Sequence, residues 1–369
     1  MALNDQDRLW MQQALEHATR GEGQVEPNPM VGCLIARGDQ LLSAGWHGQF
    51  GGPHAEIVAL QAATESLVEA TLYVTLEPCC QQGKTGPCSD AIITAGIRRV
   101  VVADIDPSPQ VNGKGIRQLE EAGVEVLQGL LQEEARSLLA PYRKGIRCGK
   151  PWVIAKWAMT LDGRIATRSG SSQWISSEAS REAVHQLRGR MDAVIIGRGT
   201  AVADDPLLTV RPPGPRTPLR VVVTSRGELP AGCQLLKTAA DVPLLVTAGP
   251  EATHADLASL EDAGCQLLYI QNTDNTIDEL LKELGTRQMT NVLVEGGSQL
   301  LGAFRDGDHV DEVHVFMAPK LVGGDQAPGP LGGRGSELMA DALTLEKPRF
   351  TTLSDDIYLH GRLAGRSQL

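Results

Sequence analysis

The residues that decide the fold are H-A-E at positions 54–56, followed by E-P-C at 77–79 and P-C at 87–88. One histidine and two cysteines form a ligand set typical of a zinc ion that keeps one coordination position open. A carboxylate beside such an ion can take a proton from water and return it to a leaving group. The pattern therefore predicts a zinc site formed by His54, Cys79 and Cys88. Glu56 is the predicted catalytic acid and base.

The same residues also permit plainer interpretations. A single histidine at a helix start is usually a cap, and a single cysteine is usually a small core residue. A structural zinc site is another alternative, but such sites usually have four protein ligands and no free carboxylate beside them. Cys80 is an alternative to Cys79 as a ligand, and Cys79 is preferred because it follows Pro78. The joint pattern favours a catalytic zinc site.

Strand and helix patterns alternate on both sides of these residues. Strands are predicted at 31–36, 72–76 and 100–103, and helices at 1–20, 54–65, 89–95, 115–121 and 130–145. His54 and Cys88 thus stand at predicted helix starts, where the partial positive charge of a helix favours a thiolate. The alternation indicates helices that cover a sheet. The run C-G-K-P at 148–151 interrupts it, so we expect domains at 1–149 and 150–369.

The second half begins a new strand pattern. Strands are predicted at 152–158, 193–196, 219–224, 243–246, 266–270, 292–294 and 312–317, with a hairpin at 349–363. Glycines follow two of these strands, in G-R-G-T at 197–200 and E-G-G at 295–297. Glycine after a strand lets backbone amides approach a pyrophosphate, and two such loops suit a ligand crevice. Each loop alone could equally be an ordinary turn.

Arginines near these loops are candidate phosphate ligands. Arg188 and Arg211 could clamp a substrate phosphate, because the guanidinium fork matches phosphate oxygens. Their alternative role is that of solvated surface charges. Arg211 is the better candidate because it ends an apolar, strand-like run.

Composition excludes several classes of protein. The net charge of −11 and the lack of a Lys/Arg-rich run disfavour nucleic-acid binding. No run of eighteen apolar residues predicts a membrane span, and no signal peptide is recognised, so we expect a cytoplasmic enzyme. The seven cysteines are better interpreted as thiols or ligands than as disulfides. Those outside the zinc pattern are predicted to be structural, namely Cys33, Cys148, Cys233 and Cys265.

Further motifs give the chain a specific resemblance. They are P-N-P-M-V-G at 27–32, K-W-A-M-T-L-D-G at 156–163, S-Q-W-I at 172–175 and A-D-D-P-L-L-T-V-R at 203–211. With the zinc pattern and the glycine loops, the chain resembles the bifunctional deaminase/reductase family of riboflavin biosynthesis over nearly its whole length. The resemblance implies a cytidine-deaminase-like α/β/α domain followed by a dihydrofolate-reductase-like α/β domain.

The resemblance also implies an activity. The first domain would use Zn²⁺, one ion per chain, to deaminate 2,5-diamino-6-(5-phosphoribosylamino)pyrimidin-4-one. The second would use NADPH to reduce the ribosyl group of 5-amino-6-(5-phosphoribosylamino)uracil to ribityl. The family pattern further implies a homo-oligomer joined through the reductase domains. Alternatives are a reductase with an impaired deaminase domain and, from another class, a deaminase-fold protein that edits or binds nucleic acid.

Site residues carry over by resemblance, motif by motif. Residues implied to contact the deaminase substrate are Asn28, His47, Lys84 and Asp106. Those implied to contact the reductase substrate are Lys156, Ser172, Arg188, Leu208, Arg211 and Glu295. Those implied to bind the nicotinamide cofactor are Ala158, Trp174, Thr200, Asp204, Gly296 and Gly297.

Two departures from the family pattern concern substrate contacts. The family usually reads C-S-H-H-G after the first zinc cysteine, whereas this chain reads C-C-Q-Q-G at 79–83. Gln81 can form hydrogen bonds but cannot carry a proton at neutral pH. Ser108 stands where the family usually has asparagine. The zinc ligands and Glu56 are intact, so these departures motivate the impaired-deaminase alternative without deciding it.

Overall fold

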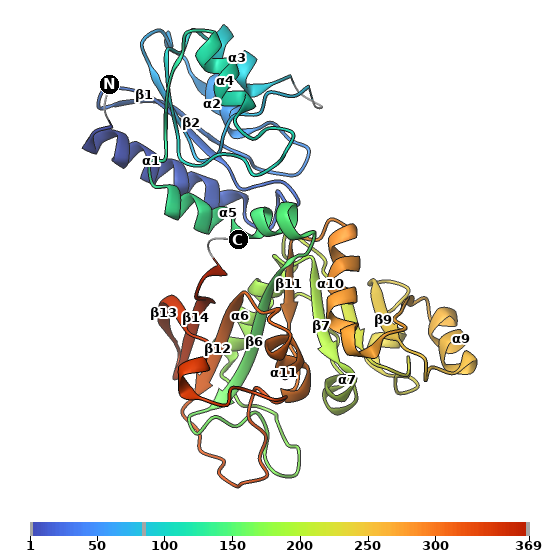
Figure 1. Ribbon diagram of the computed structural model, residues 1–369. Coiled ribbons are helices and arrows are strands. Elements are labelled where there is room, and N and C mark those ends of the chain that lie inside the picture. Colours follow the sequence, from blue (N-terminus) through green and yellow to red (C-terminus); the bar gives the residue numbers. More distant parts are fainter. Residues whose placement is uncertain (1–2, 83–85, 367–369) are drawn as a thin grey trace. The chain divides into compact units, whose positions relative to one another are not determined.

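The computed structural model describes residues 3–82 and 86–366. The chain divides into two compact units, with the division between Cys148 and Gly149. Unit 1 contains the zinc pattern, and unit 2 contains the glycine loops. Each unit is built around its own sheet (Figure 1).

Unit 1 contains a five-stranded sheet in the order β2-β1-β3-β4-β5. Its strands are β1 (Gly32–Arg37), β2 (Gln40–Trp46), β3 (Thr71–Val74), β4 (Arg99–Val102) and β5 (Glu125–Gln128). β1 runs antiparallel to both β2 and β3, whereas β3, β4 and β5 are parallel. Parallel strands buried on both faces need helices on both sides.

Helices cover both faces of this sheet (Figure 1). They are α1 (Asp5–Ala18), α2 (Ala55–Ala62), α3 (Cys88–Thr94), α4 (Lys114–Glu121) and α5 (Gln132–Cys148), with a short 3₁₀ turn at Thr19–Gly21. Ile35 packs with the core below α2, α3 and α4, while its neighbour Leu34 packs with the core below α1 and α5. Successive strand residues point to opposite faces, which explains this division. The predicted α/β/α layering is confirmed.

Some sequence-based predictions for unit 1 were wrong. β2 and β5 were missed, because both are edge strands with many exposed or half-buried residues and weak apolar patterns. The helix predicted to end near residue 145 continues to Cys148 and accommodates Pro141. Cys148 is exposed, so it does not have the core position expected of a structural cysteine.

Unit 2 contains a nine-stranded sheet in the order β10-β9-β8-β7-β11-β6-β12-β14-β13. The pairings from β10 to β12 are parallel, and β14 and β13 add an antiparallel hairpin. The strands are β6 (Trp152–Thr160), β7 (Ala193–Gly197), β8 (Leu219–Val223), β9 (Leu244–Ala248), β10 (Gln266–Tyr269), β11 (Asn291–Val294), β12 (Glu312–Ala318), β13 (Leu345–Leu353) and β14 (Asp356–Leu363). Every predicted strand of this half is present, and so is the hairpin.

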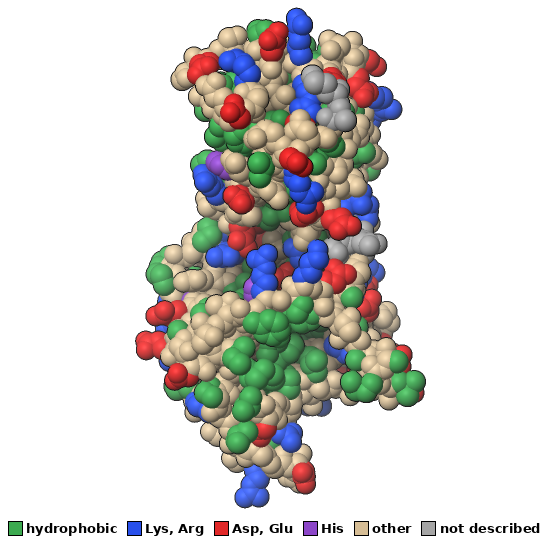
Figure 2. Space-filling view, turned by 90° about the vertical axis from the view of Figure 1, so that its left-hand side faces the viewer, with side chains coloured by type: hydrophobic (Ala, Val, Ile, Leu, Met, Phe, Trp, Pro, Cys, Tyr) green, Lys and Arg blue, Asp and Glu red, His purple; other side chains and the backbone are tan. Residues whose placement is uncertain are grey.

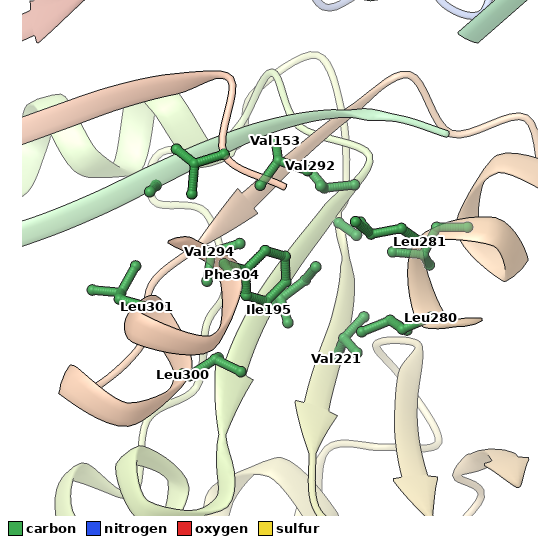
Figure 3. Close-up of a cluster of buried hydrophobic side chains, with 14 of the residues drawn as sticks. Val153, Ile195, Val221, Leu280, Leu281, Val292, Val294, Leu300, Leu301 and Phe304 are labelled. Carbon is green, nitrogen blue, oxygen red and sulfur yellow. The ribbon is translucent and has the colours of Figure 1, made fainter. Parts of the chain in front are cut away.

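The main core of unit 2 lies between the sheet and two helices. Figure 3 shows Phe304 and Leu301 of α11, with Leu280 and Leu281 of α10, against strand side chains such as Val294. The helices of this unit are α6 (Glu178–Arg188), α7 (Arg198–Asp204), α8 (Gln234–Lys237), α9 (His254–Asp262), α10 (Thr276–Thr286) and α11 (Ser298–Asp306), with 3₁₀ turns at Thr273–Asn275 and Met339–Asp341. This packing fixes the loops that follow β7 and β11.

Candidate active sites

The three predicted zinc ligands lie together in unit 1. His54 is the N-cap of α2, Cys88 is the first residue of α3, and Cys79 follows the loop after β3. His54 Nδ1 lies 3.3 Å from Cys88 Sγ and 3.5 Å from Cys79 Sγ. The three ligand atoms all lie within 4.8 Å of one another. One imidazole and two thiols at this spacing fit the nitrogen and sulfur preferences of zinc, and Cys80 does not belong to this cluster of described residues.

Glu56 lies beside the zinc ligands, in the first turn of α2. It follows His54 by two residues at the start of α2 and is only 3% exposed. Burial, together with the nearby Cys79, raises the pKa of Glu56 to about 7. A carboxyl group in these surroundings can exchange a proton near neutral pH.

Asn28 and His47 form the next layer beside the zinc ligands. His47 Nδ1 donates to the carbonyl oxygen of Pro53 at 2.9 Å, which leaves Nε2 to accept from Asn28 Nδ2 at 3.1 Å. The rings of His47 and His54 meet edge to face, with centroids 5.6 Å apart. The structure thus brings two predicted substrate residues to the zinc ligands.

Asp106 is buried in the loop between β4 and α4. Its Oδ1 accepts from the backbone N–H of Ser108 at 2.8 Å and from the hydroxyl of Tyr142 at 3.0 Å. Ser108 therefore contributes its backbone to this contact, a function that does not require asparagine. Gln81 donates from Nε2 to the carbonyl oxygen of Gln110 at 2.9 Å, which ties its side chain to the same loop. Lys84 lies outside the described residues.

Glu77 is a site residue that the sequence analysis missed. Its buried carboxylate accepts backbone N–H groups from Gly113 at 2.8 Å and Gly115 at 2.9 Å, with longer contacts to Asp106 and Ile116. Glu77 lies two residues before Cys79, so it anchors the loop of Asp106 next to the zinc cluster. Its place in the E-P-C motif was the available signal.

The second site is a cleft of about 1900 Å³ in unit 2. Every residue assigned to the reductase substrate or to the nicotinamide cofactor lines it. These residues are Lys156, Ala158, Ser172, Trp174, Arg188, Thr200, Asp204, Leu208, Arg211, Glu295, Gly296 and Gly297. They come from β6 and the segment after it, from the end of α6, from α7 and the segment after it, and from the loop after β11. Because β6, β7 and β11 are parallel, a ligand in the cleft would lie at the carboxyl ends of these strands.

An ion-pair cluster lies within this cleft. Arg188 pairs with Glu295 through two nitrogens, with Nη2 2.9 Å from Oε2, and Lys156 Nζ lies 3.3 Å from the same oxygen. Burial by itself would raise the pKa of Glu295, but the charges of Arg188 and Lys156 outweigh it and lower the pKa to about 2. Glu295 is therefore ionised, and Arg188 has a carboxylate partner before any phosphate binds.

The glycine loops have the close packing expected of a binding loop. The backbone N–H of Gly297 donates to Thr200 Oγ1 at 3.0 Å, which links the loops after β7 and β11. A Cβ on Gly296 would lie 3.0 Å from Leu300. Gly297 is the N-cap of α11 and offers no side-chain cap, so the first N–H groups of that helix remain available to an anion.

The remaining predicted residues also line the cleft. Ser172 Oγ donates to Asp204 Oδ1 at 3.2 Å, and the guanidinium of Arg181 stacks over Trp174 at 4.7 Å. Arg211 is exposed, whereas Leu208 is buried with a φ of 55°. The sequence analysis missed several polar residues that line the cleft after the ends of β8 and β10. The available signal was their position after predicted strands. They are Thr224, Ser225, Thr273, Asp274 and Asn275.

Comparison with known proteins identifies both units. Residues 4–104 match the cytidine and deoxycytidylate deaminase zinc-binding region, and residues 151–359 match the RibD C-terminal domain. The riboflavin biosynthesis protein RibD of Actinobacillus pleuropneumoniae is 39% identical over 96% of this chain and 94% of its own. The same protein of Escherichia coli K12 is 36% identical over 96% of this chain and 99% of its own.

Solved structures agree over the same length. RibD of Acinetobacter baumannii, form 1, superposes with a TM-score of 0.84 at 37% identity, covering 97% of this chain and 99% of that one. A diaminohydroxyphosphoribosylaminopyrimidine deaminase/5-amino-6-(5-phosphoribosylamino)uracil reductase from Thermotoga maritima superposes with a TM-score of 0.84 at 33% identity and the same coverage.

A zinc-deaminase domain followed by a reductase domain defines a bifunctional deaminase and reductase. The chain belongs to the RibD family of riboflavin biosynthesis. The predicted fold classes are confirmed, and so is the bifunctional enzyme, which is favoured over a reductase alone. The predicted cofactors, Zn²⁺ and NADPH, are those of this family. No helix in the described part of the chain has both the length and the hydropathy to span a bilayer.

Proposed function

We propose that unit 1 hydrolyses the ring 2-amino group of 2,5-diamino-6-(5-phosphoribosylamino)pyrimidin-4-one and that unit 2 reduces the ribosyl group of the product. We place the boundary between the two activities at residues 149 and 150. The observation that carries the proposal is the convergence of His54, Cys79 and Cys88 beside buried Glu56. The activities named for the Thermotoga maritima relative support the substrates.

In the proposed deamination, a C–N bond breaks, a C–O bond forms and ammonia leaves. Zn²⁺, when bound by His54, Cys79 and Cys88, supplies the Lewis-acid activation that lets water ionise near neutral pH. Glu56 takes the proton from water and delivers it to the departing amine. Asn28, held by His47, presents its carboxamide to the pyrimidine ring. We assign Asp106 and Lys84 to further contacts with the substrate, with Lys84 near the substrate phosphate.

In the proposed reduction, the ring C1–O bond of the ribosyl group is replaced by a C1–H bond and the ring oxygen takes a proton. NADPH, when bound, supplies the hydride. The loops at Thr200, Gly296 and Gly297 hold the cofactor, with Ala158, Trp174 and Asp204 on the same side of the cleft. Arg211, which is exposed in the cleft, takes the substrate phosphate.

The ion-pair cluster positions the reductase substrate. Arg188 and Lys156 keep Glu295 ionised and fixed, so that its carboxylate can accept hydrogen bonds from the substrate. Ser172 and Leu208 complete the substrate side of the cleft.

Mass spectrometry of the diaminopyrimidinone phosphate after incubation with the zinc-loaded protein tests both activities in order. Without NADPH, we expect the mass change of an amino group replaced by a hydroxyl. With NADPH, we expect the further gain of two hydrogens. Glu56→Gln should abolish the first change and leave the reduction of deaminated substrate intact. Deamination that survives in Glu56→Gln would show that the proton carrier is another group.

We further propose that the protein forms a homo-oligomer through unit 2. Figure 2 shows a hydrophobic patch on the face of unit 2 where β13 and β14 lie. Large exposed hydrophobic residues from this part of the chain are Leu331, Leu338, Met339, Leu343, Phe350 and Ile357. Patches of this kind mark interaction sites.

Light scattering should give more than one chain per particle, and Phe350→Lys should shift the particle toward a monomer. A monomeric wild type would contradict this proposal.

We also propose that the enzyme works in the cytoplasm on phosphorylated pyrimidines. None of the seven cysteines forms a disulfide, as expected in a reducing compartment. Cell fractionation that recovers the protein with cytoplasmic markers is the expected result.

A further inference from the structure

A second group of side chains of the kinds that can bind a metal ion lies in the sheet of unit 2, apart from the residues that line the cleft. Glu312 and His314 are on β12, and His360 is on β14. One ligand atom from each lies within 4.8 Å of the other two. The three side chains are half-buried or buried.

The strand register explains why these side chains meet. His314 and His360 are direct partners in the antiparallel pairing of β12 with β14. Glu312 precedes His314 by two residues, so its side chain projects from the same face of the sheet. The imidazole rings of His314 and His360 stack with centroids 5.3 Å apart. All three side chains thus project from paired strands and not from loops.

Neighbouring groups orient two of the ligands. The indole N–H of Trp152 donates to Glu312 Oε2 at 3.1 Å, which leaves Oε1 directed at His314 Nε2, 3.1 Å away. The Nδ1 atom of His314 lies 2.7 Å from the hydroxyl of Tyr358. A polar partner on the far nitrogen of a histidine is a common feature of metal sites, because it fixes the ring and its tautomer.

We propose that Glu312, His314 and His360 bind a divalent transition metal ion, zinc in the first instance, that links β12 to β14. Two imidazoles and one carboxylate suit zinc, with a fourth position left to solvent. The site has no thiolate, and Arg362 Nε lies 3.7 Å from Glu312 Oε2. We therefore expect weaker binding here than at the cysteine-containing site of unit 1.

A hydrogen-bonded chain without metal is the competing interpretation. Such a chain runs from Tyr358 through His314 to Glu312 and accounts for both short contacts. It gives no function to His360, which stacks on the rings of His314 and Tyr358. A metal site gives a function to all three side chains. It also predicts a second bound ion per chain, which the chain of hydrogen bonds does not.

The test is metal stoichiometry of the full-length protein. Chelator-treated wild type is dialysed against Zn²⁺ and analysed by plasma mass spectrometry. We expect His360→Ala to bind one ion fewer per chain than wild type. The matched control is His254→Ala, on the surface of α9, which should bind as many ions as wild type. Equal zinc in His360→Ala and wild type would overturn the proposal.

Two further measurements separate this site from that of unit 1. The Cys79→Ser/Cys88→Ser variant should retain one ion per chain, which Glu312→Gln in the same background should remove. Titration with Co²⁺ should give thiolate charge-transfer absorption first, followed by ligand-field bands without further charge transfer. Circular dichroism of the chelated variants should match wild type. Absence of any bound ion in a folded Cys79→Ser/Cys88→Ser protein would overturn the proposal, whatever the activity of the first site.

Discussion

One buried carboxylate, that of Glu77, positions the loop next to the zinc ligands of unit 1. Glu77 has no part in the proposed chemistry, yet it accepts four backbone N–H groups from the segment between Asp106 and Ile116. A buried donor left unpaired costs about 1–3 kcal/mol. The position of the site therefore depends on a residue that touches none of the proposed substrate.

Glu77→Gln should destabilise unit 1 by about 2–3 kcal/mol, because the amide replaces one acceptor oxygen by a donor that faces backbone N–H groups. Deamination should fall, while reduction of deaminated substrate should persist. Urea unfolding followed by circular dichroism measures the change in stability. Glu121→Gln, at the exposed end of α4, is the matched control and should behave as wild type. Equal stability of the two variants would contradict this account of Glu77.

Some of the site was predictable residue by residue, and some was not. His54 and Cys88 stand at helix starts, and Glu56 follows His54 by two residues. Local sequence patterns are therefore enough to predict that these three residues belong to the site. The contact of Asp106 with Tyr142 joins residues 36 apart, which no local pattern reveals. Likewise His314 and His360 meet only because β12 pairs with β14 in one particular register.

At the scale of elements, one ion-pair cluster joins three parts of unit 2. Lys156 is on β6, Arg188 ends α6 and Glu295 follows β11. Since the pKa of Glu295 in the folded protein is lowered to about 2, its charge favours the folded state. The stabilisation is complete above the ordinary carboxyl pKa of about 4.5 and is lost as the pH falls toward 2.

Glu295→Gln should therefore be less stable than wild type at pH 7 by about 3 kcal/mol, an order-of-magnitude value from the linkage relation. The difference between the two proteins should shrink between pH 4.5 and pH 2. Chemical denaturation at pH 7 and again near pH 3 measures it. Glu283→Gln, in a half-exposed pair on α10, provides a control with little expected effect. A difference that is independent of pH would contradict the assigned ionisation.

Elements were predictable where their apolar pattern is strong. The buried strands β7, β8 and β11 are almost uniformly apolar, so their positions follow from the sequence. β2 was missed because burial alternates with exposure and Gly45 interrupts it, although that glycine is required where the strand meets α2. Sheet order, which sets the cleft, depends on contacts between distant strands and does not follow from these patterns.

At the scale of the whole molecule, the zinc cluster and the nicotinamide cleft belong to different compact units. Each unit has its own sheet and its own core. Damage to one site should therefore leave the other site folded.

Cys79→Ser should lose the zinc of unit 1 and deaminase activity, while NADPH-dependent reduction of deaminated substrate stays within about twofold of wild type. The reason is that the two sites belong to separate compact units. Metal analysis together with separate assays of the two reactions checks this. Cys80→Ser is the matched control and should keep zinc and both activities. Loss of zinc in Cys80→Ser would assign the ligand to the neighbouring cysteine, and parallel loss of both activities in Cys79→Ser would argue against independent units.

The hydrogen bonds of Glu77 to the backbone determine where unit 1 can tolerate changes of sequence. The backbone N–H groups of Asp106 and Gly113 are held by the same carboxylate oxygen, so both ends of the intervening segment are anchored to one atom. The positions of both ends of the segment 107–112 therefore depend on Glu77 and not on the side chains within the segment. Because Glu77 binds backbone groups, substitutions of exposed side chains within this segment should leave both anchored ends in place.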